Sequence, residues 1–298
     1  MSTPIELEDG QHQLGSVLIG RGTSVRIATI EGLGQPSVRS QDVEPPGEDG
    51  LWIGADYYSG RTLRIDAGIS QSGNQAGALD TLAALQADAD SAGVRGSGGL
   101  TMSLRLKFPG RPTRVVRGRL RKLEPDVTKS IHGWIPLDIE FQGQDHLYYA
   151  DEPDTTSIPL GILSHGGFTA PIVPPFTIAG DPFAVGRPSF LSVAGTAPTW
   201  PLLRVNGPCA NPSITHVESG VSITVQTTLA DGEWVEIDTR PGWRTVLRNN
   251  GGGAPMTPQS RIDLFRLTPG PNEIAWAATD PTLTSTLAVT WWPAYKAL

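Results

Sequence analysis

Residues 211–239, NPSITHVESGVSITVQTTLADGEWVEIDT, decide how the last hundred residues of this chain fold. Apolar and polar residues alternate along them, and Gly or Asp interrupts the alternation at short intervals. Because the side chains of a β-strand point to opposite faces with a period of two, this pattern is typical of strands in a half-buried sheet. The pattern continues on both sides, from Thr199 to Pro293. We therefore expect an antiparallel β-sandwich here.

The composition favours short strands in the rest of the chain as well. A length of 298 residues suits two domains of about 150 residues each. The 35 glycines and 26 prolines leave little room for long helices. The predicted class is mainly β, with two β-sandwich or barrel-like domains, the first of which carries one α-helix. The net charge of −7 disfavours a nucleic-acid-binding protein, since such proteins usually show a basic face.

Candidates for metal or cofactor chemistry are weak. The single cysteine, Cys209, excludes an intrachain disulfide and a cysteine-cluster metal site, and its neighbours favour a buried, inert thiol. The five histidines lack the spacing of a zinc motif, and no helix follows the glycine-rich tracts to form a phosphate cradle. We expect no cofactor, no metal and no catalytic residue, and therefore not an enzyme.

The amino terminus shows neither the basic start nor the apolar core of a signal peptide. No run of residues reaches the roughly 18 apolar residues of a membrane span. We expect a protein that is made in a cytoplasm and does not insert into a membrane.

The amino-terminal half combines strand-like runs with one polar segment and one helix. Residues 35–50 are rich in charge and turn formers, which is typical of a functional loop or of an extended hairpin, an arm that reaches beyond its own domain. Residues 76–92 read as the helix, with Gly93 as its C-cap. Its expected apolar face consists of Leu79, Leu82, Ala83 and Leu85.

Two groups of charged residues are candidates for an interface in a ring. Asp88 and Asp90 lie near the carboxyl end of the predicted helix, where the helix dipole disfavours them. Either water solvates both at small cost, or they meet a basic partner surface. Arg117, Arg119 and Arg121 recur at every second position and so fall on one face of a predicted strand. Such a face is usually solvated, but it also suits an acidic subunit in a ring or a polyanion.

Proline and glycine become frequent between positions 153 and 198. We place the domain junction in this stretch. The first domain then comprises residues 1–152, and the second comprises residues 153–298 including the junction.

The carboxyl-terminal domain offers two further candidates. Glu236 and Asp238 lie on one strand face roughly 7 Å apart, a separation that suits an inverting glycosidase but that any solvated strand face produces. Glu233 lies nearby in the sequence. Trp234 and Trp243 are candidates for stacking on sugar rings if they are exposed, although most aromatic residues of a sandwich pack in its core.

Five motifs carry a resemblance to a known family: WP at 200–201, NPSI at 211–214, GEWVEID at 232–238, LTPGPNEI at 267–274 and VTW at 289–291. Together they resemble the carboxyl-terminal domain of siphophage distal tail proteins and related minor tail proteins. The layout of the amino-terminal half is similar to the tail-tube-like belt domain of the same family.

The resemblance implies a structural, non-enzymatic protein of the phage virion, at the baseplate end of a non-contractile tail. It implies a homohexameric ring that joins the tail tube to the tail tip and adsorption apparatus. The amino-terminal domain would form a belt, and the carboxyl-terminal domain would be a galectin-like sandwich. The implied partners are the major tail tube protein, the tail tip or hub protein and receptor-binding proteins, while DNA would only pass through the ring. The alternative is a carbohydrate-binding protein that contacts the host surface.

Overall fold

The computed structural model describes residues 5–91, 94, 100–160, 183–185 and 189–298. The chain forms two compact units. The first consists of Met1–Asp151 and Tyr295–Leu298, and the second consists of Glu152–Ala294. The predicted domain junction at 153–198 lies in large part outside the described residues, so it stays a prediction.

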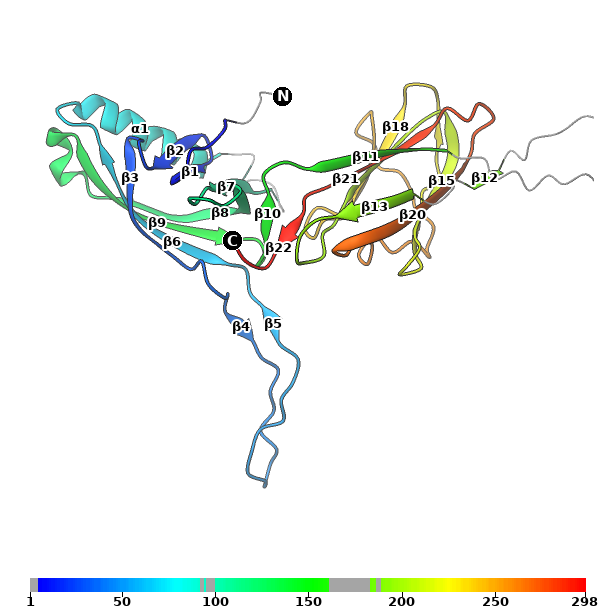
Figure 1. The fold of residues 1–298 in the computed structure, drawn as a ribbon, viewed down its shortest axis with the longest axis horizontal. Coiled ribbons are helices and arrows are strands. Elements are labelled where there is room, and N and C mark those ends of the chain that lie inside the picture. Colours follow the sequence, from blue (N-terminus) through cyan, green and yellow to red (C-terminus); the bar gives the residue numbers. More distant parts are fainter. Residues whose placement is uncertain (1–4, 92–93, 95–99, 161–182, 186–188) are drawn as a thin grey trace, which may run out of the picture. The chain divides into compact units, whose positions relative to one another are not determined.

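Seven strands of the first unit close into a barrel (Figure 1). In order around it they are β8 (Arg114–Pro125), β7 (Met102–Leu106), β1 (Gln11–Leu14), β2 (Val17–Gly20), β3 (Val25–Glu31), β6 (Thr62–Ser70) and β9 (Trp134–Gly143). Neighbouring strands are antiparallel except β2 and β3. Closure depends on the length of β8, because its first part pairs with β7 and its second part with β9.

The barrel core follows from alternation along the strands. Every second residue of β9, from Ile135 to Phe141, is buried, and the residues between them are only partly covered. Across the pair with β6, Ile65 lies opposite Ile139 and Leu63 opposite Phe141. Two aligned apolar rows therefore fill the interior.

Three further elements lie beside the barrel strands: η1 (Val127–His132), β10 (Tyr148–Ala150) and β22 (Ala294–Tyr295). β10 pairs with the start of β8, where the Arg114 guanidinium lies 3.5 Å above the centre of the Tyr295 ring. The segment Tyr295–Leu298 thus returns to the unit that the amino terminus began.

The predicted helix is α1 (Gln75–Ala89), and it begins where Asn74 Oδ1 accepts a 2.9 Å hydrogen bond from Gly77 N. Its buried residues are Ala78, Leu82 and Leu85, which recur at the i, i+4, i+7 spacing of one helical face. The predicted apolar face was wrong in two members, because Leu79 and Ala83 are exposed. The predicted C-cap, Gly93, lies outside the described residues.

The polar segment at 35–50 belongs to an extended hairpin, hereafter the arm (residues 35–58). Its legs contain β4 (Val38–Arg39) and β5 (Tyr57–Tyr58), and a bridge joins Val43 to Trp52 nearer the tip. Figure 1 shows the arm leaving the barrel between β3 and β6. Of the two alternatives drawn from the sequence, the structure shows the hairpin.

The second unit is a sandwich of two antiparallel sheets. One sheet contains, in order, β11 (Asp154–Pro159), β21 (Thr286–Trp291), β14 (Leu202–Asn206), β18 (Trp234–Asp238) and β19 (Thr245–Arg248). The other contains β12 (Phe183–Val185), β20 (Gly270–Thr279), β15 (Cys209–His216) and β16 (Val221–Thr224), with β13 (Ser189–Val193) on β20 and β17 (Thr228–Leu229) on β15. The mainly β class and the sandwich are thus confirmed.

Inward-facing residues of both sheets form one core. Ile274, Trp276 and Ala278 of β20 share it with Leu203 and Val205 of β14. Residues 261–267 form turns, with only an isolated bridge between Leu267 and Thr199. Phe265 and Leu267 are nevertheless fully buried. The apolar residues of this segment therefore belong to a loop that packs on the core, and not to a strand.

No helix in the described part of the chain is both long and apolar enough to cross a membrane.

Candidate assembly surface

The base of the arm is fixed by a buried arginine. Arg61 comes directly before β6, where the returning leg ends, and its side chain is only 1% exposed. Its Nη1 donates to the carbonyl oxygens of Gly32 and Gly34 on the outgoing leg, and its Nη2 donates to that of His146 at 2.9 Å. The guanidinium also lies 4.3 Å from the centre of the Tyr148 ring. The two legs therefore leave the barrel at a defined place.

Beyond this base the arm exposes apolar side chains. Trp52 is 64% exposed and Ile53 is 86% exposed. The other exposed apolar residues of the arm are Val38, Val43, Leu51, Tyr57 and Tyr58. Single exposed apolar residues are normal, but a concentration of them on one thin element is typical of a contact with another molecule.

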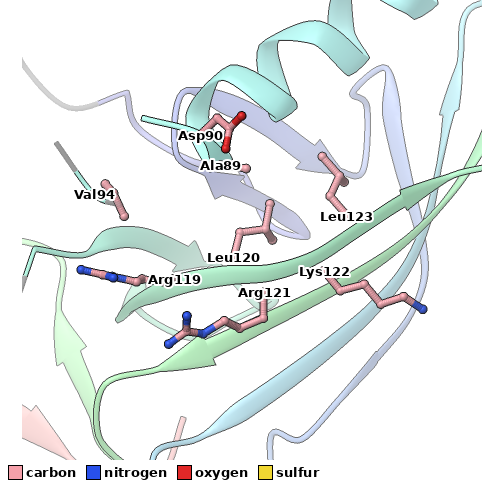
Figure 2. A pocket seen from close by; sticks show the side chains of 8 residues that line it. All are labelled: Ala89, Asp90, Val94, Arg119, Leu120, Arg121, Lys122 and Leu123. Atoms are coloured by element: carbon pink, nitrogen blue, oxygen red, sulfur yellow. The ribbon is translucent and has the colours of Figure 1, made fainter. Parts of the chain in front are cut away.

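A groove of about 400 Å³ lies between the carboxyl end of α1 and the second part of β8. Its apolar lining consists of Ala89, Val94, Leu120 and Leu123, and its charged lining consists of Asp90, Arg119, Arg121 and Lys122. Figure 2 shows Leu120 and Leu123 pointing from the strand towards the helix end. A second hollow of about 420 Å³ shares Arg119 and Arg121 with the first.

The two aspartates of the helix end have different surroundings. Asp88 is half-buried, and its Oδ2 accepts hydrogen bonds from Ser16 N at 2.6 Å and from Ser16 Oγ at 2.8 Å. It thereby holds the turn between β1 and β2 against α1. Asp90 is exposed and lines the groove. The two aspartates thus differ in exposure, and only Asp90 lines the groove.

The three predicted arginines do not share a regular strand face. Arg117 lies over the Tyr149 ring at 5.5 Å, and Arg119 Nε donates to the carbonyl oxygen of Leu100 at 3.0 Å. The register between β8 and β9 shifts between Leu120 and Lys122, so Arg121 is the extra residue of a bulge. The alternation predicted from the sequence therefore stops at this position, although Arg119 and Arg121 still line the same groove.

The two predicted sugar-stacking residues each have an arginine beside the ring. Arg204 lies 4.1 Å from the centre of the Trp234 ring, and Arg240 lies 5.2 Å from that of Trp243. Arg240 is also 5.3 Å from the Trp292 ring, and a bidentate ion pair with Asp238 holds it there. Both tryptophans are half-buried, and each ring has a cation–π contact with an arginine.

The candidate carboxylates are engaged in a similar way. Asp238 is buried and paired with Arg240, with a shortest N–O distance of 2.6 Å. Glu233 accepts a 2.9 Å hydrogen bond from Ala230 N and pairs with Arg248 at 3.1 Å. The Ala230 hydrogen bond, with help from Arg248, lowers the pKa of Glu233. The general acid of a glycosidase needs a raised pKa, which is the opposite of the shift at Glu233.

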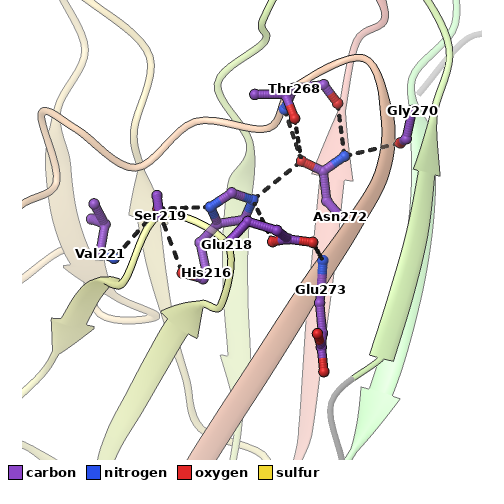
Figure 3. A network of polar contacts seen from close by, with 8 residues as sticks. All are labelled: His216, Glu218, Ser219, Val221, Thr268, Gly270, Asn272 and Glu273. Carbon is purple, nitrogen blue, oxygen red and sulfur yellow. Dashed lines mark hydrogen bonds and ion pairs between the residues drawn. The ribbon is translucent and has the colours of Figure 1, made fainter.

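A buried histidine centres a polar network in the second unit (Figure 3). His216 Nε2 lies 3.1 Å from Asn272 Oδ1 and 3.2 Å from Glu218 Oε2, and Nδ1 lies 2.7 Å from Ser219 Oγ. Because Asn272 Nδ2 donates to the carbonyl oxygens of Thr268 and Gly270, its Oδ1 must face the histidine. Nε2 therefore carries a proton, and the network joins the turn after β15 to the start of β20.

Cys209 is buried in the sandwich core, as the sequence suggested. Burial, together with the nearby Asp280 carboxylate, raises the pKa of its thiol to about 11. The thiol is therefore protonated and unreactive at neutral pH.

The apolar part of both surfaces was not predicted from the sequence. The signal for the arm was the run LWIGADYY at 51–58, which is too apolar to belong to a solvated loop. The signal for the groove was the pair Leu120 and Leu123, whose spacing breaks the alternation of the arginines. No local pattern identifies Arg61 as a buried residue.

Comparison with known proteins places these features in context. Residues 194–295 match the family model of the siphovirus-type tail component, carboxyl-terminal domain. The crystal structure of the Dit protein of phage SPP1, described as a paradigm of the hub adsorption apparatus in phages that infect Gram-positive bacteria, matches with a TM-score of 0.59 and 16% identity, over 94% of this chain and 97% of that chain. A chain of the phage P2 baseplate, in its activated conformation with calcium, matches with a TM-score of 0.57 and 12% identity over the same shares. A comparison with curated proteins found no match.

Proposed function

We propose that this chain, a structural protein of the siphophage distal tail, forms the ring that joins the tail tube to the tail tip and adsorption apparatus. The siphovirus tail family indicated by the sequence is confirmed by the match over residues 194–295, and the fold agrees over 94% of the chain. A component of the phage tail belongs to the virion, which is where the sequence placed it.

The observation that best supports a ring assembly is that the first unit is a closed barrel from which a long apolar arm projects. A closed barrel has no free sheet edges except where strands extend beyond it, so copies that associate would do so through such projections and side-chain surfaces. A heterologous contact between identical copies closes into a ring when the rotation permits. The known baseplate chain with this fold supports an assembly of this kind.

The two units divide the task in this proposal. The first unit, which contains almost all of the predicted belt domain 1–152, makes the ring and continues the tail tube. The second unit, which contains most of the predicted domain 153–298, supplies a galectin-like platform for the tail tip or receptor-binding proteins. A galectin-like fold does not by itself imply that the protein binds sugars, because binding depends on the residues of the site.

The candidate interface residues from the sequence enter the proposal with different roles. Asp90, Arg119 and Arg121 line the groove and are proposed to meet a neighbouring copy. Arg117 and Asp88 are proposed to shape that surface through the Tyr149 ring and Ser16. Arg119 also has a contact within the chain, to the carbonyl oxygen of Leu100.

Light scattering of the purified protein across a concentration series, followed by electron microscopy, tests the ring. A closed ring with a central channel, six-fold as the family resemblance implies, is the expected result. Labelling of intact tails tests the location separately, and label along the whole tube or on the head would contradict the proposal.

A further inference from the structure

The arm combines its apolar surface with a strong negative charge. Between residues 35 and 58 it carries five carboxylates, those of Asp42, Glu44, Glu48, Asp49 and Asp56. Arg39 is its one cation. The tip of the arm consists of residues 44–51, between the bridge partners Val43 and Trp52. Three of the five acids, Glu44, Glu48 and Asp49, lie in this tip. A docking surface for the arm therefore needs an apolar floor and a basic rim.

The groove beside α1 has this chemistry. Leu120 and Leu123 form its floor on the β8 side, and Arg119 and Arg121 lie along it (Figure 2). Its volume of about 400 Å³ falls in the range of pockets that accommodate a small ligand, which is enough for a bulky side chain. Lys122 contributes little net charge, because it pairs with both Glu124 and Asp138. The other charged residues of the lining are Arg119, Arg121 and Asp90, so the lining holds two arginines against one carboxylate.

We propose that the arm of one copy docks in this groove of a second copy, with Leu51, Trp52 and Ile53 against Leu120 and Leu123. The tip carboxylates then lie near Arg119 and Arg121. The inference rests on the proposed ring and names the contact that closes it. Because the arm and the groove are different surfaces of the same chain, each copy offers one of each. A contact of this kind is heterologous and propagates around a ring.

Mixed single-cysteine variants test the contact directly. Ile53→Cys places a thiol on the arm, and Ala89→Cys places one in the groove lining. Cys209 does not interfere, because it is buried and its thiol is protonated. After mild oxidation, disulfide-linked dimers are expected in the mixture and in neither variant alone. Phe190→Cys, on an exposed position of the second unit, is the matched control and should not cross-link to Ile53→Cys.

Charge reversal provides a second measurement. Arg121→Glu should raise the concentration needed for half-maximal association about tenfold, because it places like charges together. Combining it with Glu48→Arg and Asp49→Arg should restore most of the association. The rescue distinguishes a contact between arm and groove from a general loss of folding.

Three results would overturn the inference. Rings without cross-links in the mixture would reject the arm–groove contact while the proposed ring stands. Dimers of Ile53→Cys alone would show that arms meet arms. A chain that stays monomeric at its highest soluble concentration would exclude a second copy as the occupant, and labelling of tails would then decide the proposed function by itself.

Discussion

Arg61 Nη1 donates a 2.9 Å hydrogen bond to the carbonyl oxygen of Gly32, and so joins the two legs of the arm where they leave the barrel. The arginine is buried and binds three carbonyl groups of the chain. Arg61→Ala would leave these acceptors without their donor and remove the ring contact with Tyr148. We expect it to lower the free energy of unfolding by about 3 kcal/mol.

Urea unfolding followed by tryptophan fluorescence measures this loss. Arg64→Ala is the matched control, because the Arg64 side chain is 66% exposed and only reaches Glu140 at 3.6 Å. The control should change the stability by less than about 0.5 kcal/mol. Equal effects of the two substitutions would contradict the assigned role of Arg61.

Gly32 itself is required by its backbone. Its φ is +84°, and a Cβ atom added there would lie 2.0 Å from the carbonyl oxygen of Thr62. Gly47, at the arm tip, has a similar φ of +86° but no atom within 4 Å of such a Cβ. Gly32→Ala should therefore destabilise the first unit clearly more than Gly47→Ala, which incurs only conformational strain of about 1 kcal/mol. Thermal unfolding of the two variants makes the comparison.

Asn272 supports the sandwich through a side chain that is fully buried and hydrogen-bonded at both ends. Asn272→Ala would remove one of the partners of His216 Nε2 and would leave the carbonyl oxygens of Thr268 and Gly270 without their side-chain donor. The expected loss of stability is about 3 kcal/mol. Asn249→Ala, at an exposed position of the same unit, should change it by less than about 0.5 kcal/mol. Chemical unfolding provides both values, and a mild effect at Asn272 would mean that water replaces the lost bonds.

His12 makes the first unit sensitive to acid. Burial lowers the pKa of His12 from 6.5 to about 4, and its Nδ1 accepts a 3.1 Å hydrogen bond from Lys107 N. The unfolded chain therefore takes up a proton at a higher pH than the folded chain. Stability due to the neutral imidazole is fully present above pH 6.5 and declines as the pH falls towards 4.

His12→Gln should flatten this decline, because glutamine does not titrate. The predicted difference between the slopes of wild type and variant corresponds to at most about 3 kcal/mol over the interval. Urea midpoints at a series of pH values measure it. Parallel profiles for the two proteins would show that His12 is protonated at the same pH in both states.

The sequence predicted most of the sandwich, because strands such as Trp234–Asp238 alternate and turns interrupt them. It failed where long-range contacts decide local structure. Arg121 falls in a bulge because of how β8 pairs with β9, which its own neighbours do not specify. The sequence of residues 261–267 resembles that of a strand, because apolar and polar residues alternate at Phe265, Arg266 and Leu267. In the structure the two apolar side chains are buried, but the segment that contributes them is a loop.

The candidate surface was predictable only in its charges. Asp90, Arg119 and Arg121 were found from helix polarity and strand alternation, and the structure brings them to one groove. Nothing in the local sequence indicates that Leu120 and Leu123 face the end of α1, since this depends on closure of the barrel. The negative charge of the arm follows from its composition, but the sequence does not determine that the arm forms a hairpin.

The return of Tyr295–Leu298 to the first unit makes the second unit an insertion within it. A ribosome must therefore synthesise the sandwich before Tyr295–Leu298 can join the barrel unit. This segment includes the Tyr295 aromatic ring, which lies against the Arg114 guanidinium. Lys296, Ala297 and Leu298 also line a hollow with Tyr58 and His146 at the arm base. Nascent chains that have not reached position 295 consequently lack one wall of that hollow.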